Sequence, residues 1–175
     1  MTLQSLLEPY RDRLSVPERS EAEDQLHVTA DYLEVHASGA LGLDVAQDLP
    51  VDASLRDQVP FWARDVSILA RATAVEREEL PAVLDSVFYL VGATYGGGLL
   101  VQISRGARRG KLGTIPDSAI PSFELGEVPV PPSPIDDDHA ADTYLEELQR
   151  GGGIRLHDLD LLGFLDLRLR SATRP

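Results

Sequence analysis

The chain has no cysteine among its 175 residues. This absence excludes disulfide bonds, thiolate catalysis and the cysteine-rich zinc sites of small domains, and it fits a reducing compartment. No apolar run approaches the roughly 18–20 residues that a membrane-spanning helix needs. The opening residues, MTLQSLLEPYRDRL, lack a basic start and carry acids among their apolar positions, unlike a secretory signal. We therefore expect a soluble cytoplasmic protein.

Basic residues are also scarce. The chain has 16 Lys and Arg against 29 Asp and Glu, which gives a formal net charge of -13. Such a surface repels phosphate backbones and anionic membranes, so we expect neither nucleic acid nor membrane as a partner. A basic protein is a more compatible partner than an acidic one. The alternative is that the acids only keep the protein soluble.

The length and the hydrophobic content of 43% predict one domain that spans residues 1–175. A chain of this size buries roughly 70% of its unfolded surface in a single core. Its clearest local pattern is three apolar runs rich in β-forming residues and separated by glycines. Because glycine permits the positive φ angles of tight turns, the pattern predicts a small antiparallel meander. The three runs are Val87–Val91, Leu99–Ser104 and Lys111–Ile115.

Helices are expected before this meander. Leu3, Leu6, Leu7, Tyr10 and Leu14 have helical spacing, and Ser5 with Glu8 is spaced as a capping box. Further helices are predicted from Pro17, around Trp62 and over Val75–Leu84, where Pro81 breaks or delays the last one. Residues 33–37 fit either the end of a helix or an edge strand, and Trp62 is expected to anchor the core.

After the meander, residues 116–134 form a proline-rich arm or loop. Because proline fixes φ and has no N–H to donate, we expect this stretch to be neither a central strand nor a helix. It is either an extended arm laid over the sheet or a surface loop. A helix of about three turns is then bracketed by Asp136–Asp138 and Gly151–Gly153. The leucine-rich tail, Ile154–Arg170, fits either a helix or a strand.

The expected fold class is therefore α+β. In this fold, N-terminal helices pack on a small antiparallel meander, which is followed by the proline-rich arm and a C-terminal helix.

No motif assigns a catalytic residue or a cofactor. The glycines of Gly106-Ala107-Arg108-Arg109-Gly110-Lys111-Leu112 are one residue too close for a phosphate-binding loop, and Leu112 replaces the required hydroxyl. Gly96–Gly98 lacks the strand-to-helix context of a dinucleotide-binding turn. There is no Gly-x-Ser-x-Gly elbow, and no histidine lies near a serine in the sequence in a way that reveals a role. His27 and His36 have no recognisable partners. We expect hairpin turns at both glycine clusters.

Two acidic clusters are the candidate binding residues. Carboxylates and histidines in residues 136–139 and 157–160 could supply metal ligands if the fold joined them, but helix capping and loop positions also explain them, so no metal is predicted. We instead take the aspartates as candidates for a partner-facing acidic patch, with solvated caps as the alternative. These residues are Asp136, Asp137, Asp138, Asp158 and Asp160.

Three stretches resemble the SUKH superfamily, which groups yeast cell-wall regulators with many bacterial immunity proteins. Val87–Ser104 resembles that family's strand pair around a glycine turn. Gly110-Lys111-Leu112 is similar to the start of its next strand, and Ala140–Leu148 resembles its late helix with an aromatic before Leu-Glu-Glu. The resemblance implies an α+β domain that catalyses nothing and binds another protein, most often a toxin neutralised inside the producing cell. An acidic chain is compatible with a basic toxin because opposite charges steer association.

Two other functions stay open. The first is an enzyme or small-molecule binder with a pocket between the meander and Trp62 or Tyr95. The second is a structural adaptor whose arm, Pro116–Pro134, docks to another subunit.

Overall fold

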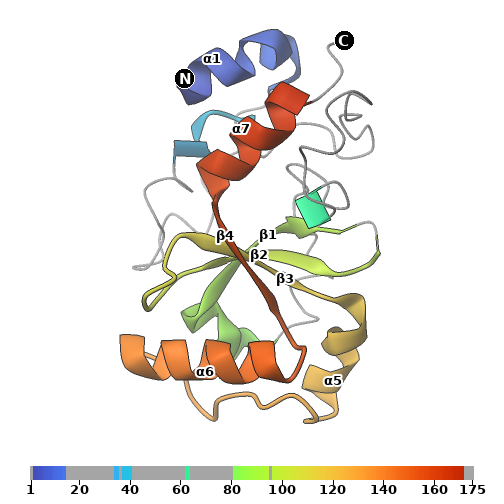
Figure 1. Ribbon diagram of the computed structural model, residues 1–175, viewed down its shortest axis with the longest axis vertical. Coiled ribbons are helices and arrows are strands. Elements are labelled where there is room, and N and C mark those ends of the chain that lie inside the picture. The colour runs from blue at the N-terminus through green and yellow to red at the C-terminus, as the bar shows by residue number, and fades with distance from the viewer. Residues whose placement is uncertain are drawn as a thin grey trace.

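A four-stranded antiparallel sheet lies between two layers of helices (Figure 1). The computed structural model describes residues 2–14, 34–35, 37–40, 62–63, 81–94 and 96–171. The strands follow one another across the sheet in chain order: β1 (Phe88–Ala93), β2 (Leu99–Ile103), β3 (Lys111–Ile115) and β4 (Arg155–Asp160). The architecture is α+β, as the sequence predicts, and β1 to β3 are the expected meander.

The two helical layers bury both faces of the sheet. The upper layer in Figure 1 contains α1 (Leu3–Leu7), η1 (Glu8–Arg13) and α7 (Leu161–Ser171). The lower layer contains η5 (Ala82–Ser86), η6 (Asp117–Ala119), α5 (Ile120–Glu124) and α6 (Asp138–Arg150).

Strand β2 shows why both layers are needed. Side chains alternate between the faces of a strand, yet every residue of β2 is buried. Leu100 belongs to the upper core with α1 and α7, whereas Val101 and Ile103 belong to the lower core with α6. A continuously apolar strand of this kind is typical of a sheet covered on both faces.

Positive φ angles occur at the turns where glycine was expected. Gly97 has φ 85° between β1 and β2, and Gly106 and Gly110 have φ 78° and 85° between β2 and β3. Both glycine clusters are therefore hairpin turns. The hairpin between β2 and β3, residues 105–110, is important below and is called the basic hairpin, because it carries Arg105, Arg108 and Arg109.

Helix α6 begins and ends near the predicted residues. Asp137 is its N-cap and accepts from the backbone N–H of Ala140 at 2.8 Å, and Gly152 just beyond its C-terminus has φ 77°. Its inner side buries Ala141, Tyr144, Leu145 and Leu148 against the sheet.

The N-terminal capping box lies three residues earlier than predicted. Thr2 caps α1 together with Ser5, so Ser5 is the third helical residue and not the cap, and Glu8 opens the following 3-10 turn. Thr2 is a better cap because its extended backbone leaves its hydroxyl free to accept from the Ser5 N–H. Of the segment predicted as either a helix end or an edge strand, the described residues Glu34, Val35 and Ala37 are helical. The helix predicted from Pro17 lies almost wholly outside the described residues, as do His27, His36 and Tyr95.

The prediction that the proline-rich stretch contains no helix is wrong. Residues 117–124 form η6 and α5, because Pro121 stands in the first turn of α5, where its missing N–H costs no hydrogen bond. Of the two alternatives for this stretch, an arm over the sheet or a surface loop, the first does not describe residues 129–135. They run beside α6, and the Tyr144 hydroxyl donates to the Pro129 carbonyl at 2.8 Å.

The leucine-rich tail is both a strand and a helix. Strand β4, which the sequence did not single out, pairs with β3 and leads directly into α7. Among the described residues, no helix is long and apolar enough to cross a membrane.

Candidate functional site

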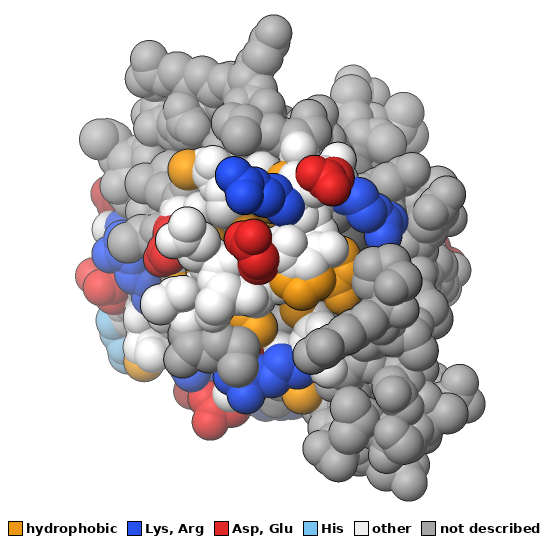
Figure 2. All heavy atoms as spheres, turned by 90° about the horizontal axis from the view of Figure 1, so that it is seen from above, with side chains coloured by type: hydrophobic (Ala, Val, Ile, Leu, Met, Phe, Trp, Pro, Cys, Tyr) orange, Lys and Arg blue, Asp and Glu red, His pale blue; other side chains and the backbone are white. Residues whose placement is uncertain are grey.

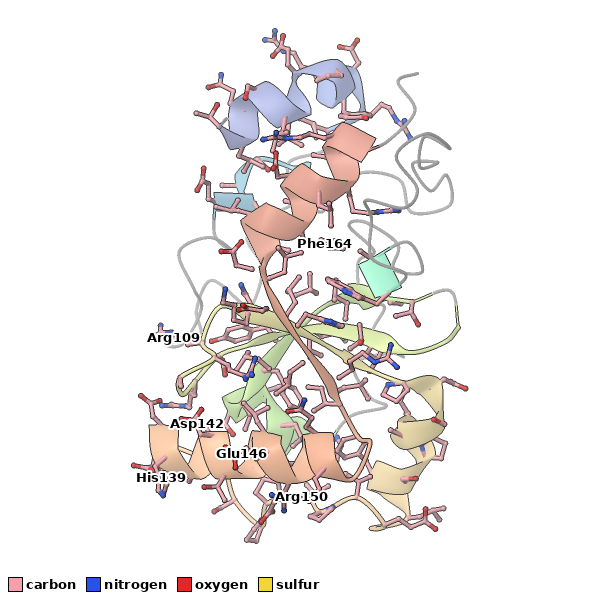
Figure 3. All side chains as sticks on the ribbon, viewed as in Figure 1. Arg109, His139, Asp142, Glu146, Arg150 and Phe164 are labelled. Atoms are coloured by element: carbon pink, nitrogen blue, oxygen red, sulfur yellow. The ribbon has the colours of Figure 1, made fainter. Side chains whose placement is uncertain are left out.

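Backbone N–H groups of the basic hairpin form hydrogen bonds with carboxylates in the first turns of α6. The backbone N–H of Gly106 donates to Asp138 Oδ1 at 3.1 Å. The N–H of Ala107 donates to both carboxylate oxygens of Asp142, at 2.9 and 3.2 Å. Figure 3 shows Asp142 on the side of α6 that faces the hairpin carrying Arg109. Two carboxylates of one helix therefore fix the backbone of a turn more than thirty residues earlier in the chain.

Gly106 makes this contact possible. A Cβ atom at this position would lie 2.2 Å from Asp142 Oδ1, well inside van der Waals contact, and the φ of 78° also disfavours a side chain. Gly110, at the other end of the hairpin, has nothing within 4 Å of such a Cβ. The hairpin thus requires glycine at Gly106 for packing and at Gly110 only for backbone conformation.

Ser86 forms hydrogen bonds with residues next to this contact between the hairpin and α6. Its carbonyl accepts from Ser104 Oγ and from Arg105 Nε, each at 3.1 Å. Its hydroxyl accepts from the N–H of Ile135 at 2.9 Å, and Arg105 Nη1 donates to the Asp136 carbonyl at 3.2 Å. Ser86 and Ser104 therefore have structural partners that position the segment leading into α6.

Residues 136–150 concentrate negative charge. They contain six carboxylates and one arginine, Arg150. Asp137 caps the helix, and Asp138 and Asp142 hold the hairpin. Among the described residues, no cation or hydrogen-bond donor pairs with the side chains of Asp136, Glu146 and Glu147, and all three are exposed. These three carboxylates are called the α6 acidic face.

A hollow of about 590 Å³ lies between α6 and the proline-rich arm. Asp136 and Glu147 of the α6 acidic face line it, together with the prolines of residues 129–134 and with Tyr144. Burial, and then the charge of Glu147, raises the pKa of the Tyr144 phenol, so it stays protonated and donates to the Pro129 carbonyl. The hollow therefore combines apolar rings with carboxylates at its wall.

The opposite side of the molecule differs in charge. Seen from above in Figure 2, acidic and basic side chains surround an apolar area, and neither sign dominates. Glu8, Arg11 and Asp12 of this side are exposed, and Arg11 approaches Glu8 at 3.9 Å. Among the described surfaces, the excess of acid is therefore greater on α6.

The five candidate aspartates lie in two groups, one at the start of α6 and one on β4. Asp136 to Asp138 stand at the start of α6, as described. Asp158 on β4 forms an ion pair of 3.3 Å with Lys111, the first residue after the hairpin. Asp160 accepts from the N–H of Gly163 at 2.7 Å and so caps α7. Capping thus accounts for Asp137 and Asp160, and Asp136 is left with a free side chain among the described residues.

A second candidate region lies beside the meander at Trp62. A cavity of about 380 Å³ opens there. Its wall combines an aromatic ring, two threonines, apolar side chains and one guanidinium. The described lining residues are Trp62, Thr94, Thr114, Ile115, Pro116, Gln149, Gly152, Ile154 and Arg155.

Trp62 is held in this wall by His157. The two rings stack with centroids 3.7 Å apart, and the indole also stacks on Phe164 of α7 at 5.8 Å. His157 Nε2 lies 3.0 Å from Thr114 Oγ1. Burial, and then the charge of Arg155, lowers the pKa of His157 to about 4, so the imidazole is neutral at physiological pH. Trp62 is only half-buried and packs against the upper core, so it anchors that core and also faces the cavity.

The acidic clusters form no metal site in the described part of the chain, where no three His, Asp or Glu side chains are grouped to hold an ion. His157 is buried, whereas Asp158 next to it is exposed, because neighbouring residues of a strand point to opposite faces.

Sequence reasoning missed Asp142 and Arg155. Asp142 follows Asp138 by one helical turn, which is a usable signal, but its partner on the hairpin is distant in sequence. Arg155 gives no local signal, because its role depends on the pairing of β4 with β3.

No protein-family model matches the chain, and no curated protein or solved structure matches it.

Proposed function

We propose that this chain is a non-catalytic domain that binds a basic protein through the α6 acidic face. The observation that carries the proposal is a set of three exposed carboxylates without a described partner: Glu146 and Glu147 on α6, and Asp136 just before its N-cap. Two other acids of the same segment are already used to hold the hairpin, so the helix that carries the free charges is itself fixed in place.

The architecture supports a helix as the recognition element. Both faces of the sheet are buried under helices, so the outer sides of those helices are available to a partner. The hollow beside α6 adds apolar rings to the carboxylates. A lysine or arginine of the partner can lay its aliphatic stem on the proline rings and place its charge near Asp136 or Glu147.

The charge of the whole chain acts in the same direction. A net charge of -13 attracts a basic partner over distances of about a Debye length and raises the association rate. The proposal agrees with what the resemblance to the SUKH superfamily implies, namely an immunity protein that neutralises a basic toxin in the cytoplasm of the producing cell.

The test compares two double variants with the same change in charge. Glu146→Lys with Glu147→Lys reverses the charge of the α6 acidic face, and Glu8→Lys with Asp12→Lys does so on the opposite, mixed-charge side. All four positions are exposed, and Lys and Glu have similar helix propensities, so both variants are expected to fold. Circular dichroism and thermal unfolding verify this.

Binding to the purified product of the adjacent gene is then measured by calorimetry. We expect micromolar or tighter binding by the unaltered chain and by the Glu8/Asp12 variant, and a loss of roughly tenfold or more in the Glu146/Glu147 variant. Equal affinities of the two double variants would refute the role of α6. No interaction at micromolar concentration would count against the function itself.

A second function, binding of a small molecule, is favoured by one specific observation. The cavity at Trp62 lies beside the meander, which is the position of the small-molecule pocket that the sequence suggests as an alternative. Its volume is within the usual range for small-molecule sites. A ligand-induced rise in melting temperature would support this function.

A further inference from the structure

The cavity at Trp62 has an unusual charge for this protein. Acids outnumber bases 29 to 16 in the chain, yet the described lining residues include one arginine and no carboxylate. Among the described residues, no carboxylate pairs with Arg155 either. A cation without a counter-ion therefore stands at a cavity in a strongly acidic molecule.

Arg155 lies on the face of the sheet that borders this cavity. Arg155 of β4 is the direct cross-strand partner of Thr114 of β3, so both side chains lie on the same face of the sheet. Thr114 contacts His157, which stacks on Trp62, so the arginine is on the face that carries the indole. Exposed Pro116 adds an apolar ring to the wall, whereas Ile154 and Ile115 lie behind it in the lower core.

The hydroxyl groups in the wall can also donate. Thr94 Oγ1 accepts from the N–H of Gly98 at 2.8 Å, which leaves its own proton for another acceptor. Gln149 adds a carboxamide. The wall thus offers donors and one positive charge around an apolar surface, which is the complement of a small organic anion.

We propose that the cavity at Trp62 binds a small organic carboxylate, with its anionic group at Arg155 and its apolar body against Trp62 and Pro116. This inference rests on the second function proposed above and is independent of partner binding by α6. A guanidinium binds a carboxylate through two parallel hydrogen bonds, and the half-buried indole offers an apolar surface to the rest of the ligand.

The experiment uses the full chain and two probes of the same size. Cyclohexanecarboxylate and cyclohexanecarboxamide have similar shapes, but only the first is charged. Trp62 is the only tryptophan, so its emission reports on this cavity alone. We expect a saturable change in emission with the carboxylate, at an affinity roughly tenfold or more above that of the carboxamide.

Two arginine variants locate the charge effect. In Arg155→Gln the preference for the carboxylate is expected to disappear. Arg150→Gln is the matched control, because Arg150 is an exposed arginine on α6 that does not line the cavity. Its preference is expected to equal that of the unaltered chain.

The outcomes distinguish a failure of the anion inference from a failure of the small-molecule function. Equal binding of both probes would overturn the anion inference and leave a small-molecule site. An equal loss in Arg150→Gln and Arg155→Gln would also overturn it, because the effect would then come from general charge. No saturable change with either probe would overturn the small-molecule function as well.

Discussion

The Ala107 N–H donates to both carboxylate oxygens of Asp142, a residue thirty-five positions later in the chain. This contact joins the sheet to the helix that carries the α6 acidic face. Because the hairpin leads into β3 and α6 leads into β4, the contact also holds together two segments on either side of the proline-rich stretch.

Replacing Asp142 is expected to loosen this junction. Asp142→Ala removes a charged acceptor from the Ala107 N–H and should lower the free energy of unfolding by about 1–2 kcal/mol. Glu146→Ala, one helical turn later and without a described partner, should change it by less than about 0.5 kcal/mol. Urea denaturation measures both values. Equal losses would show that the carboxylate contact contributes nothing beyond helix stability.

Alanine substitutions at Gly106 and Gly110 distinguish the cost of lost packing from the cost of backbone strain. Both have positive φ, so alanine at either position should cost about 1 kcal/mol in strain. Gly106→Ala should cost about 1–2 kcal/mol more, because its Cβ would push the Asp142 carboxylate away from the Ala107 N–H. Thermal or urea unfolding of the two variants measures the difference. If Gly110→Ala is the more destabilising, Gly106 does not pack against α6 as described.

His157 makes stability depend on pH. Its folded pKa of about 4 is below the ordinary value of 6.5, so the unfolded chain binds the proton first as the pH falls. The stabilisation by neutral His157 is complete above about pH 6.5 and is lost as the pH falls toward 4, by up to about 3 kcal/mol. Urea unfolding from pH 8 to pH 4 measures this change.

The control for this prediction is His157→Phe, which keeps a ring against Trp62 but does not titrate. Its stability should fall less between pH 6.5 and pH 5 than that of the unaltered chain, because the side chain at position 157 no longer binds a proton. Identical pH profiles would contradict a buried, neutral histidine.

Tyr144 connects α6 to the proline-rich arm. Tyr144→Phe keeps the buried ring but leaves the Pro129 carbonyl without its 2.8 Å hydrogen bond, at an expected cost of about 0.5–1.5 kcal/mol. Limited proteolysis of residues 129–135 should become faster in the variant. Unchanged proteolysis together with unchanged stability would show that the arm is held by other contacts.

The sequence predicts the local structure of this protein better than its long-range contacts. The meander and α6 are recognisable because their glycines, aspartates and apolar spacings act within a few residues. The same local reasoning misplaced the first capping box, since Thr2 and Ser5 compete for one role with equally suitable hydroxyls.

The remaining features depend on partners that are distant in the chain. Strand β4 carries three charged side chains among its six residues and forms only by pairing with β3, about forty residues earlier. The role of Asp142 needs the hairpin, and that of Arg155 needs Thr114 across the sheet. Among the proposed aspartates, the sequence could not separate the free Asp136 from the caps Asp137 and Asp160, because all three have the same local chemistry.

The most direct test of the central claim is the affinity of the Glu146→Lys, Glu147→Lys variant for the adjacent gene product, measured beside the Glu8→Lys, Asp12→Lys variant. Recognition through α6 predicts that only the first variant loses roughly tenfold or more in affinity. The same affinity for both variants, with both of them folded, would contradict the account.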